Sequence, residues 1–284
     1  MKIATWNVNS IRARLGRVTS WLDRHRPDVL CMQETKVEDE AFPVESFTKV
    51  GYEVAFHGER GRNGVAIASR HPMDERRHGW SRGGGRGGPV GAAPHESGDR
   101  KPEDEARLLS VKVLGIDLAT VYVPNGQAVG AEAYFEKIQW LVKLRMHLAT
   151  GFDPKKPFLI CGDFNIAPED KDIWDVRLRA GLHCSKAERD ALGAMLAWGL
   201  KDTLRMKTQE GGVFSWWFYT PTDFKKNKGM RIDLLLATEP LAARLLDVTI
   251  DKEERGRQGD RREHHGAASE KPSDHAPVVA SFSG

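Results

Sequence analysis

Five apolar runs in this chain carry carboxylate, amide or imidazole side chains at or near one end, and such groups bind metal ions or move protons. Near the C-terminus, Asp274 and His275 stand side by side before the apolar run Val278–Ala280. The four earlier runs bring Asn7, Glu34, Asp163 with Asn165, and Asp233. If the runs are strands that converge on one sheet edge, these groups meet in a single acidic cluster. The pattern is typical of a divalent-metal hydrolase.

The donor set favours a hard cation. Phosphodiester hydrolysis needs a cation that neutralises charge in the transition state, a group that orients or deprotonates water, and help for the leaving oxygen. Oxygen ligands favour Mg²⁺ or Mn²⁺ over zinc or copper. Here six oxygen-bearing side chains accompany one histidine. The residues alone therefore predict an Mg²⁺-dependent phosphoryl-transfer hydrolase, with Mn²⁺ as the alternative ion.

Each of these residues also has a simpler explanation. A lone aspartate at a strand end is more often a cap or turn residue than a ligand. Glu34 could be an acid in a first helical turn, and Asp163 could stand in a β-turn. Asp233 is harder to explain in this way, because it lies within an apolar run and a buried acid needs a partner. The functional interpretation depends on all of these residues occurring together.

The composition is that of an ordinary globular protein. With 284 residues, 40% of them hydrophobic, the chain could form one large α/β domain or two small ones. The net charge of +3 indicates no particular partner. Cys31, Cys161 and Cys184 lack a C-x-x-C spacing, so we expect reduced thiols and no zinc site. Neither a signal peptide nor a membrane-spanning run is expected, and a soluble protein in a reducing compartment is the default.

Short strand-like runs recur along the chain, separated by helix patterns. Beyond the runs above, strands are predicted over residues 52–56, 64–69, 108–113, 116–123, 214–219, 246–250 and 278–282. Helix periodicity is clear from Ile11 to Leu22, with Ser10 as the N-cap, and from Tyr134 to Leu148. It is weaker around residues 192–196. This order predicts an α/β fold in which two packed sheets are flanked by helices.

Two segments interrupt this order. Arg82–Gly98 contains seven glycines and little to bury, so a surface loop is expected there. Its G-x-G-x-x-G match follows no strand and precedes no helix, which argues against a nucleotide site. Asp251–Pro272 carries opposite charges that cancel, as a solvated excursion would. We therefore predict a single domain over residues 1–284, with flexible surface insertions near 80–104 and 252–271.

The chain resembles the exonuclease III family of apurinic/apyrimidinic (AP) endonucleases, within the endonuclease/exonuclease/phosphatase superfamily. Six motifs carry the resemblance, in the order found in the family: TWNVNSIR (5–12), LCMQETK (30–36), YVPNG (122–126), GDFNIAP (162–168), MRIDLLL (230–236) and KPSDHAP (271–277). Each motif alone is a weak signal, whereas six in order are highly specific. The resemblance implies a four-layer sandwich of two mixed sheets, with the site at one edge.

The resemblance also implies roles for individual residues. The metal ligands would be Asn7, Glu34, Asp163, Asn165, Asp274 and His275. Glu34 would be the principal ligand. The catalytic side chains would be Tyr122, Asp163, Asn165, Asp233 and His275. Whether one or two metal ions act stays open.

Within that catalytic set, His275 would bind the target phosphate or act as base, oriented by Asp233. Asp163 would position or deprotonate the attacking water. Asn165 would hold the phosphate, and Tyr122 would support the phosphate or the developing charge. Whether His275 or Asp163 is the base stays open.

Substrate choice would come from other residues. By resemblance, Trp216, Met230 and Ile232 would line an apolar pocket for a flipped-out, base-free sugar, because a site without a base unstacks easily. The DNA backbone would be contacted by Arg12, Asn125, Lys225, Lys226 and Lys228. The alternatives are a buried strand for the Trp-rich run and a solvated loop for the lysines. Phe218 departs from the family, which often has an acid at this position.

The main prediction is a DNA-repair enzyme, a monomer that acts on duplex DNA with abasic sites or 3′ ends. It would cleave the phosphodiester 5′ to an abasic site, and it would also act as a 3′–5′ exonuclease and a 3′-phosphodiesterase or phosphatase. One alternative is inositol-phosphate or sphingomyelin hydrolysis on the same fold, without the Trp216/Met230 pocket. Another is a catalytically silent DNA-binding relative, which the complete catalytic set disfavours. The excursion before Asp274 is expected to border the DNA cleft, so deleting Arg257–Ala268 should weaken duplex affinity.

Overall fold

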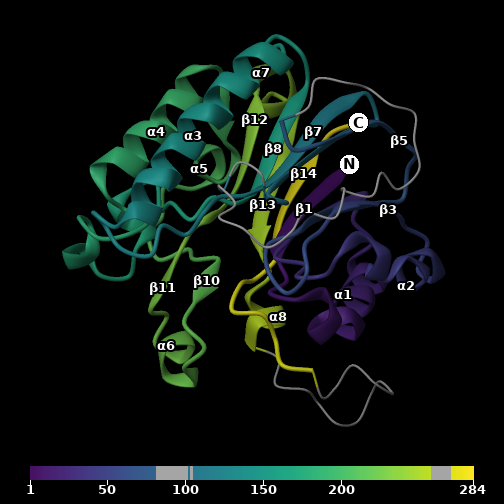
Figure 1. Cartoon of the computed structure of the whole chain (residues 1–284), viewed down its shortest axis with the longest axis horizontal. Helices are drawn as coiled ribbons and strands as arrows, with labels where there is room; N and C mark the ends of the chain where they lie inside the picture. Colours follow the sequence, from purple (N-terminus) through teal and green to yellow (C-terminus); the bar gives the residue numbers. More distant parts are fainter. Residues whose placement is uncertain (81–101, 103–104, 257–269) are drawn as a thin grey trace.

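The computed structural model describes residues 1–80, 102, 105–256 and 270–284, arranged as Figure 1 shows. In spatial order, one six-stranded sheet consists of β13 (Leu245–Ile250), β14 (Val278–Phe282), β1 (Lys2–Asn7), β2 (Val29–Gln33), β4 (Val65–Ser69) and β3 (Glu53–His57). The other consists of β5 (Met73–His78), β6 (Leu108–Val113), β7 (Ile116–Tyr122), β8 (Phe158–Asp163), β12 (Asp233–Thr238) and β9 (Leu200–Asp202). A separate ribbon pairs β10 (Trp216–Trp217) with β11 (Gly229–Met230).

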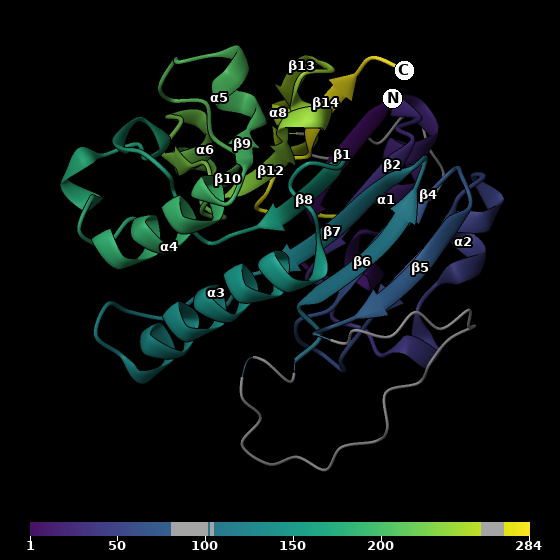
Figure 2. The same ribbon diagram turned by 90° about the horizontal axis from the view of Figure 1, so that it is seen from above.

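α-Helices surround the paired sheets (Figure 1), and only some of them cover an outer face. The helices are α1 (Ile11–His25), α2 (Val44–Lys49), α3 (Glu132–Gly151), α4 (Lys186–Ala197), α5 (Thr203–Lys207), α6 (Pro221–Lys225), α7 (Glu239–Ala242) and α8 (Lys252–Gly256). Figure 2 shows α1 and α2 on one side of the sheets, and α3 and α4 on the other. The predicted fold of two packed mixed sheets flanked by helices is confirmed. Within the described residues, no helix combines the length and apolar character needed to cross a membrane.

Three clusters of buried side chains join the four layers. The central cluster lies between the sheets and includes Leu159 and Cys161 of β8. The alternate residues Phe158 and Ile160 face the opposite side, where they pack in a cluster with α3. A third cluster joins the first sheet to α1 through residues such as Trp21. Because β8 is buried on both faces, its sequence is a continuous apolar run.

Strand register brings the ends of the apolar runs together. β1 and β2 are parallel, with Asn7 opposite Gln33, so Glu34 emerges beside Asn7. In the second sheet, Asp163 at the end of β8 lies opposite Tyr122 of β7 and opposite Asp233 of β12. The functional side chains of each sheet therefore lie next to one another at the ends of adjacent strands.

Gly162, directly before Asp163, fits this sheet only because it lacks a side chain. Its φ is +144°, and a Cβ atom there would lie 2.0 Å from the carbonyl oxygen of Val121. We expect Gly162→Ala to lower the free energy of unfolding by about 2 kcal/mol or more, measured by urea denaturation. Gly115→Ala is the control, because Gly115 also has positive φ but open space around it. Equal losses in both variants would show that the contact with Val121 is unimportant.

Two predictions about local structure are wrong. The strand predicted over 214–219 is reduced to Trp216–Trp217, because its pairing partner β11 is also only two residues long. Of the solvated excursion predicted over Asp251–Pro272, the described residues, 251–256 and 270–272, contact the rest of the protein. Residues 252–256 form α8, whose buried Glu254 pairs with Arg17 at 2.9 Å, and the Glu270 carboxylate accepts the Arg17 backbone N–H at 3.0 Å. The segment Arg257–Ala268 and most of the predicted insertion near 80–104 lie outside the described residues.

Candidate active site

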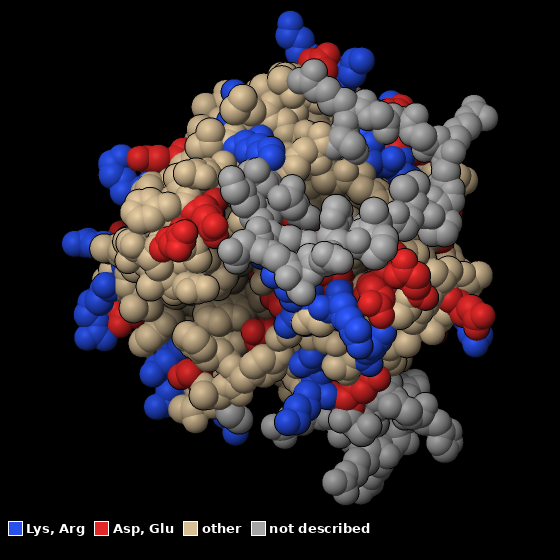
Figure 3. Space-filling view, in the orientation of Figure 1, with Lys and Arg blue, Asp and Glu red and all other residues tan. Residues whose placement is uncertain are grey.

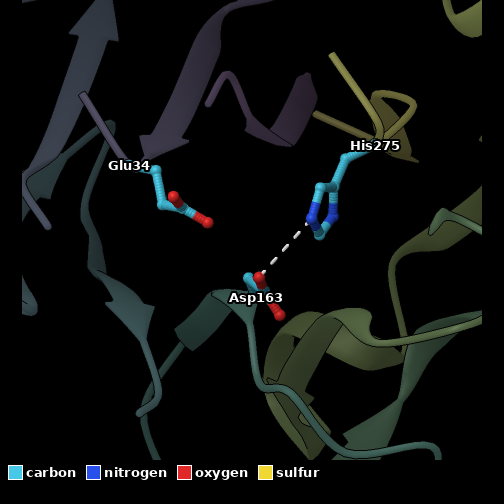
Figure 4. Close-up of side chains that lie close together, drawn as sticks. All are labelled: Glu34, Asp163 and His275. Carbon is cyan, nitrogen blue, oxygen red and sulfur yellow. Dashed lines mark ion pairs between the residues drawn. The ribbon is translucent and has the colours of Figure 1, made fainter. Parts of the chain in front are cut away.

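Glu34, Asp163 and His275 meet at the edge of the two sheets. Each offers a ligand atom within 4.8 Å of those of the other two. Figure 4 shows the three side chains converging from different segments of the chain. The imidazole Nε2 of His275 lies 3.7 Å from Oδ2 of Asp163. Two carboxylates and one imidazole form a donor set that fits a hard divalent cation.

Asn7 links the two carboxylates. Its side-chain N–H groups donate to Oε1 of Glu34 at 2.8 Å and to Oδ2 of Asp163 at 2.9 Å. Its side-chain oxygen accepts the backbone N–H of Asn9 at 3.0 Å. Asn7 thus reaches the predicted cluster, but it presents its NH₂ group to the carboxylates and holds them together.

Asp233 fixes the orientation of His275, as predicted. Its carboxylate lies 2.8 Å from Nδ1 of the imidazole, so Nε2 points toward Asp163. Asp233 is itself held, because its backbone N–H donates to the hydroxyl of Ser215 at 3.1 Å. This carboxylate–imidazole pair selects the ring orientation and the tautomer.

The pKa values of Asp163 and His275 are both strongly raised, and only that of Asp163 lies near neutral pH. Burial raises the pKa of Asp163 to about 7, although the charge of His275 opposes this rise. Burial alone would lower the pKa of His275, but the negative charges of Asp233 and Asp163 outweigh it and raise that pKa to about 10. Strongly shifted pKa values of this kind cluster at functional sites.

Tyr122 stays protonated beside these acids. Burial and then the negative charges of Glu34 and Asp163 hold its pKa well above the usual range. The guanidinium of Arg107 covers the ring at 4.8 Å from its centre. The phenol is therefore a hydrogen-bond donor to a negative group in the site.

Asn165 holds the loop that follows Asp163. Its side-chain N–H donates to the carbonyl of Val123 at 2.9 Å, and its side-chain oxygen accepts from Asn125 at 3.4 Å. The ammonium of Lys137 donates to the Asn165 carbonyl at 2.7 Å. Asn165 and Asn125 therefore lie together in the loops beside Asp163.

Asp274 stands beside the cluster of three residues. Its two oxygens accept hydrogen bonds from Asn9 at 3.0 Å and from the indole N–H of Trp216 at 3.1 Å. Burial opposes ionisation, but the charge of His275 and these hydrogen bonds lower the pKa of Asp274 below its usual value. Asp274 is thus ionised next to the site, with the predicted pocket residue Trp216 bound to it.

Asn9, Lys36 and Lys137 were not identified from the sequence as residues of the site. The Lys36 ammonium lies 2.7 Å from Oε2 of Glu34 and 2.6 Å from the side-chain oxygen of Asn9. Both residues stand inside quoted motifs, so their position was the available signal. Lys137 is fully buried and paired with Glu188 of α4. Lys137 lies three residues after Tyr134 and four before Leu141 on the buried face of α3, so helix periodicity was the available signal.

The predicted substrate residues fall into two groups. Trp216 pairs with Met230 across the β10–β11 ribbon, and Met230 and Ile232 belong to one buried apolar cluster against which Trp216 packs. Arg12, Lys225, Lys226 and Lys228 lie outside this cluster: the first three are exposed, and the ammonium of Lys228 sits 4.8 Å from the ring centre of Trp174. Figure 3 shows a recess on the face of the molecule that Figure 1 also views, with acidic and basic side chains near the rim of the recess.

The fold and the site together define a hydrolytic enzyme whose centre could hold a metal ion. Residues 4–275 match the endonuclease/exonuclease/phosphatase family. The chain is 32% identical to exodeoxyribonuclease III of Haemophilus influenzae, over 99% of this chain and 100% of that protein. It belongs to the endonuclease/exonuclease/phosphatase family, and the predicted resemblance is confirmed.

Three solved structures are similar over nearly their whole length. An AP endonuclease from Archaeoglobus fulgidus shares 37% identity with a TM-score of 0.85, and 99% of each chain is covered. A 3′–5′ exonuclease from Neisseria meningitidis shares 33% identity with a TM-score of 0.83, again with 99% of each chain covered. A related Neisseria 3′-phosphatase has been solved with a product DNA hairpin, with a TM-score of 0.82, 33% identity, and 100% of this chain and 99% of that chain covered.

Proposed function

We propose that this chain is a Mg²⁺-dependent repair endonuclease that cleaves the phosphodiester 5′ to abasic sites in duplex DNA. Its class, a hydrolytic DNA-repair nuclease, follows from the family and the relatives it resembles. The observation that carries the finer proposal is the meeting of Glu34, Asp163 and His275 beside the Trp216–Met230 pair. We further propose 3′–5′ exonuclease and 3′-phosphatase activity, and action as a monomer.

Asp163 would act on the attacking water, and His275 would bind the phosphate. Asp163 takes a proton from the attacking water, because a carboxylate with a pKa of about 7 is a competent base near neutral pH. His275 is protonated and directs Nε2 toward the site, where it binds a phosphate oxygen. Tyr122 donates its phenolic hydrogen to the same phosphate.

Glu34 would hold the metal ion, with Asn7 and Asp274 beside it, whereas the protonated His275 has no free lone pair for a metal. When bound, Mg²⁺ neutralises charge on the phosphate in the transition state. The Lys36 ammonium on Glu34 already supplies positive charge at that carboxylate. Asn7 keeps Glu34 and Asp163 in position through its two N–H bonds.

The apolar cluster behind Trp216 suits a sugar that carries no base. Met230 and Ile232 are buried in it, and the Trp216 indole is fixed by Asp274. A base-free nucleotide leaves the helix at low free-energy cost, since it loses no stacking of its own. An apolar wall next to the catalytic groups would therefore select the abasic site.

A duplex with one abasic analogue tests this function. We expect incision directly 5′ to the analogue with Mg²⁺ and none with a chelator. Glu34→Ala should lower the rate at least about 100-fold and shift the Mg²⁺ titration to higher concentration, because it removes a ligand. Glu45→Ala, at an exposed acid of α2, is the matched control. Failure of the intact protein to incise, together with turnover of an inositol phosphate, would overturn the proposal.

A further inference from the structure

Two aromatic side chains, Phe218 and Tyr219, stand on the surface directly after β10. The Phe218 ring is 53% exposed and meets Trp216 edge-to-face, with 4.5 Å between ring centres. Trp216 in turn lies 6.5 Å from the imidazole of His275. A row of rings therefore leads from the candidate catalytic centre to an exposed phenyl group.

Exposure of a single apolar side chain needs no special explanation. Val142 and Met146 of α3 are equally exposed, and nothing links them to the site. The segment that carries Phe218 is different, because it is tied down. The Phe218 carbonyl accepts from the largely buried Arg255 guanidinium at 3.0 Å, and the Trp217 backbone N–H donates to the Asp274 carbonyl at 3.1 Å.

Polar and cationic groups fix the neighbouring ring. The Tyr219 hydroxyl accepts from Asn9 at 2.8 Å and from Arg14 at 2.9 Å. The Arg255 guanidinium lies 5.8 Å from the centre of the Tyr219 ring. An exposed ring on a rigid segment, next to two guanidinium groups, has the chemistry of a platform for a nucleobase and its phosphate.

We propose that Phe218 is a specificity-determining residue that stacks on the base of a 3′-terminal nucleotide that has left the duplex. The inference rests on the proposed nuclease function. A sugar held against Trp216 and Met230 would leave its base outside the apolar cluster, at the rim where Phe218 stands. A paired base has both faces covered, so only a frayed or mismatched end presents a free face to the ring.

Two 3′ ends that differ only in the base test the inference. One duplex ends in a mismatched nucleotide, and the other ends in the same sugar without its base. For the base-bearing end, Phe218→Ala and Phe218→Leu should lower kcat/KM about tenfold, mainly through KM, because leucine keeps an apolar group but cannot stack. For the base-free end the loss should be smaller. Phe218→Trp should retain the activity on the base-bearing end.

Met146→Ala, at an exposed residue of α3, is the matched control and should leave kcat/KM unchanged for both substrates. Urea denaturation of each variant checks that the fold is kept. Equal losses on both ends, or no loss on either, would overturn the stacking role while leaving the nuclease intact. Cleavage of neither end by the unchanged protein would overturn the stacking role together with the proposed 3′–5′ exonuclease activity.

Discussion

Asp163→Asn should lower kcat on the abasic duplex by about 10²–10⁴-fold, the usual contribution of a positioned general base. The substitution keeps the shape of the side chain and an oxygen that can accept the Asn165 backbone N–H, which bonds Asp163 at 2.9 Å. It removes the negative charge and the ability to take a proton from water. Steady-state rates at saturating substrate and Mg²⁺ measure the effect.

The same substitution should change the stability of the fold only slightly. Burial raises the pKa of Asp163 above its ordinary value of 3.8, to about 7, so the folded state disfavours the ionised acid between those pH values. A neutral asparagine removes that penalty, but its NH₂ group would face the NH₂ group of Asn7, which donates to Oδ2 of Asp163 at 2.9 Å. Because these effects oppose each other, we expect an unfolding free energy within about 1 kcal/mol of that of the original protein. Asp117→Asn, at the opposite end of the same sheet, is the matched control, and near-normal turnover by Asp163→Asn would remove Asp163 from the mechanism.

Several residues in the loops of the candidate active site have a strained backbone conformation with positive φ. Asn9, Glu34, Lys36 and Asn165 all have φ between +45° and +53°, although none is glycine. Such conformations persist only where the surrounding structure holds them, and they are frequent at functional sites. Here the cores on both faces of the sheets supply the support, so the loops can keep Glu34 close to Asp163.

The sheets could be predicted from the sequence because their central strands are buried on both faces. β8 and β12 are continuous apolar runs, and short runs of this kind indicate strands that are buried on both faces. β5, Met73–His78, could not be found in this way. It has a mostly charged sequence, and backbone pairing with β6 holds it at the sheet edge. Edge strands of this type carry little apolar signal.

The acids of the site could be predicted because each stands at the end of such a run or in a specific motif. Their supporting residues could not be predicted from local pattern. Arg231 is buried only because Asp172 and Asp202, distant in the sequence, accept its guanidinium at 2.6 and 2.8 Å. A charge becomes internal through its partner, and the identity of that partner depends on tertiary structure.

Asp233→Asn should be at least as damaging as Asp163→Asn, although Asp233 would not contact the water. Its carboxylate holds Nδ1 of His275 at 2.8 Å and stabilises the protonated ring. An asparagine there can leave the imidazole in the wrong tautomer, and the comparable change in a catalytic triad lowers kcat by about 10⁴-fold. We expect a loss of about 10³–10⁴-fold in kcat with a smaller change in KM, measured on the abasic duplex.

A pH series in chelator separates this positioning role from general damage to the fold. The pKa of His275 is about 10 in the folded chain, against an ordinary value of 6.5. Between these values the folded state keeps a proton that the unfolded state has released, so stability should fall by about 1.4 kcal/mol for each pH unit of increase. Asp233→Asn removes the largest charge that raises this pKa, and the slope should weaken. A lost activity with an unchanged slope would mean that Asp233 does not act through His275.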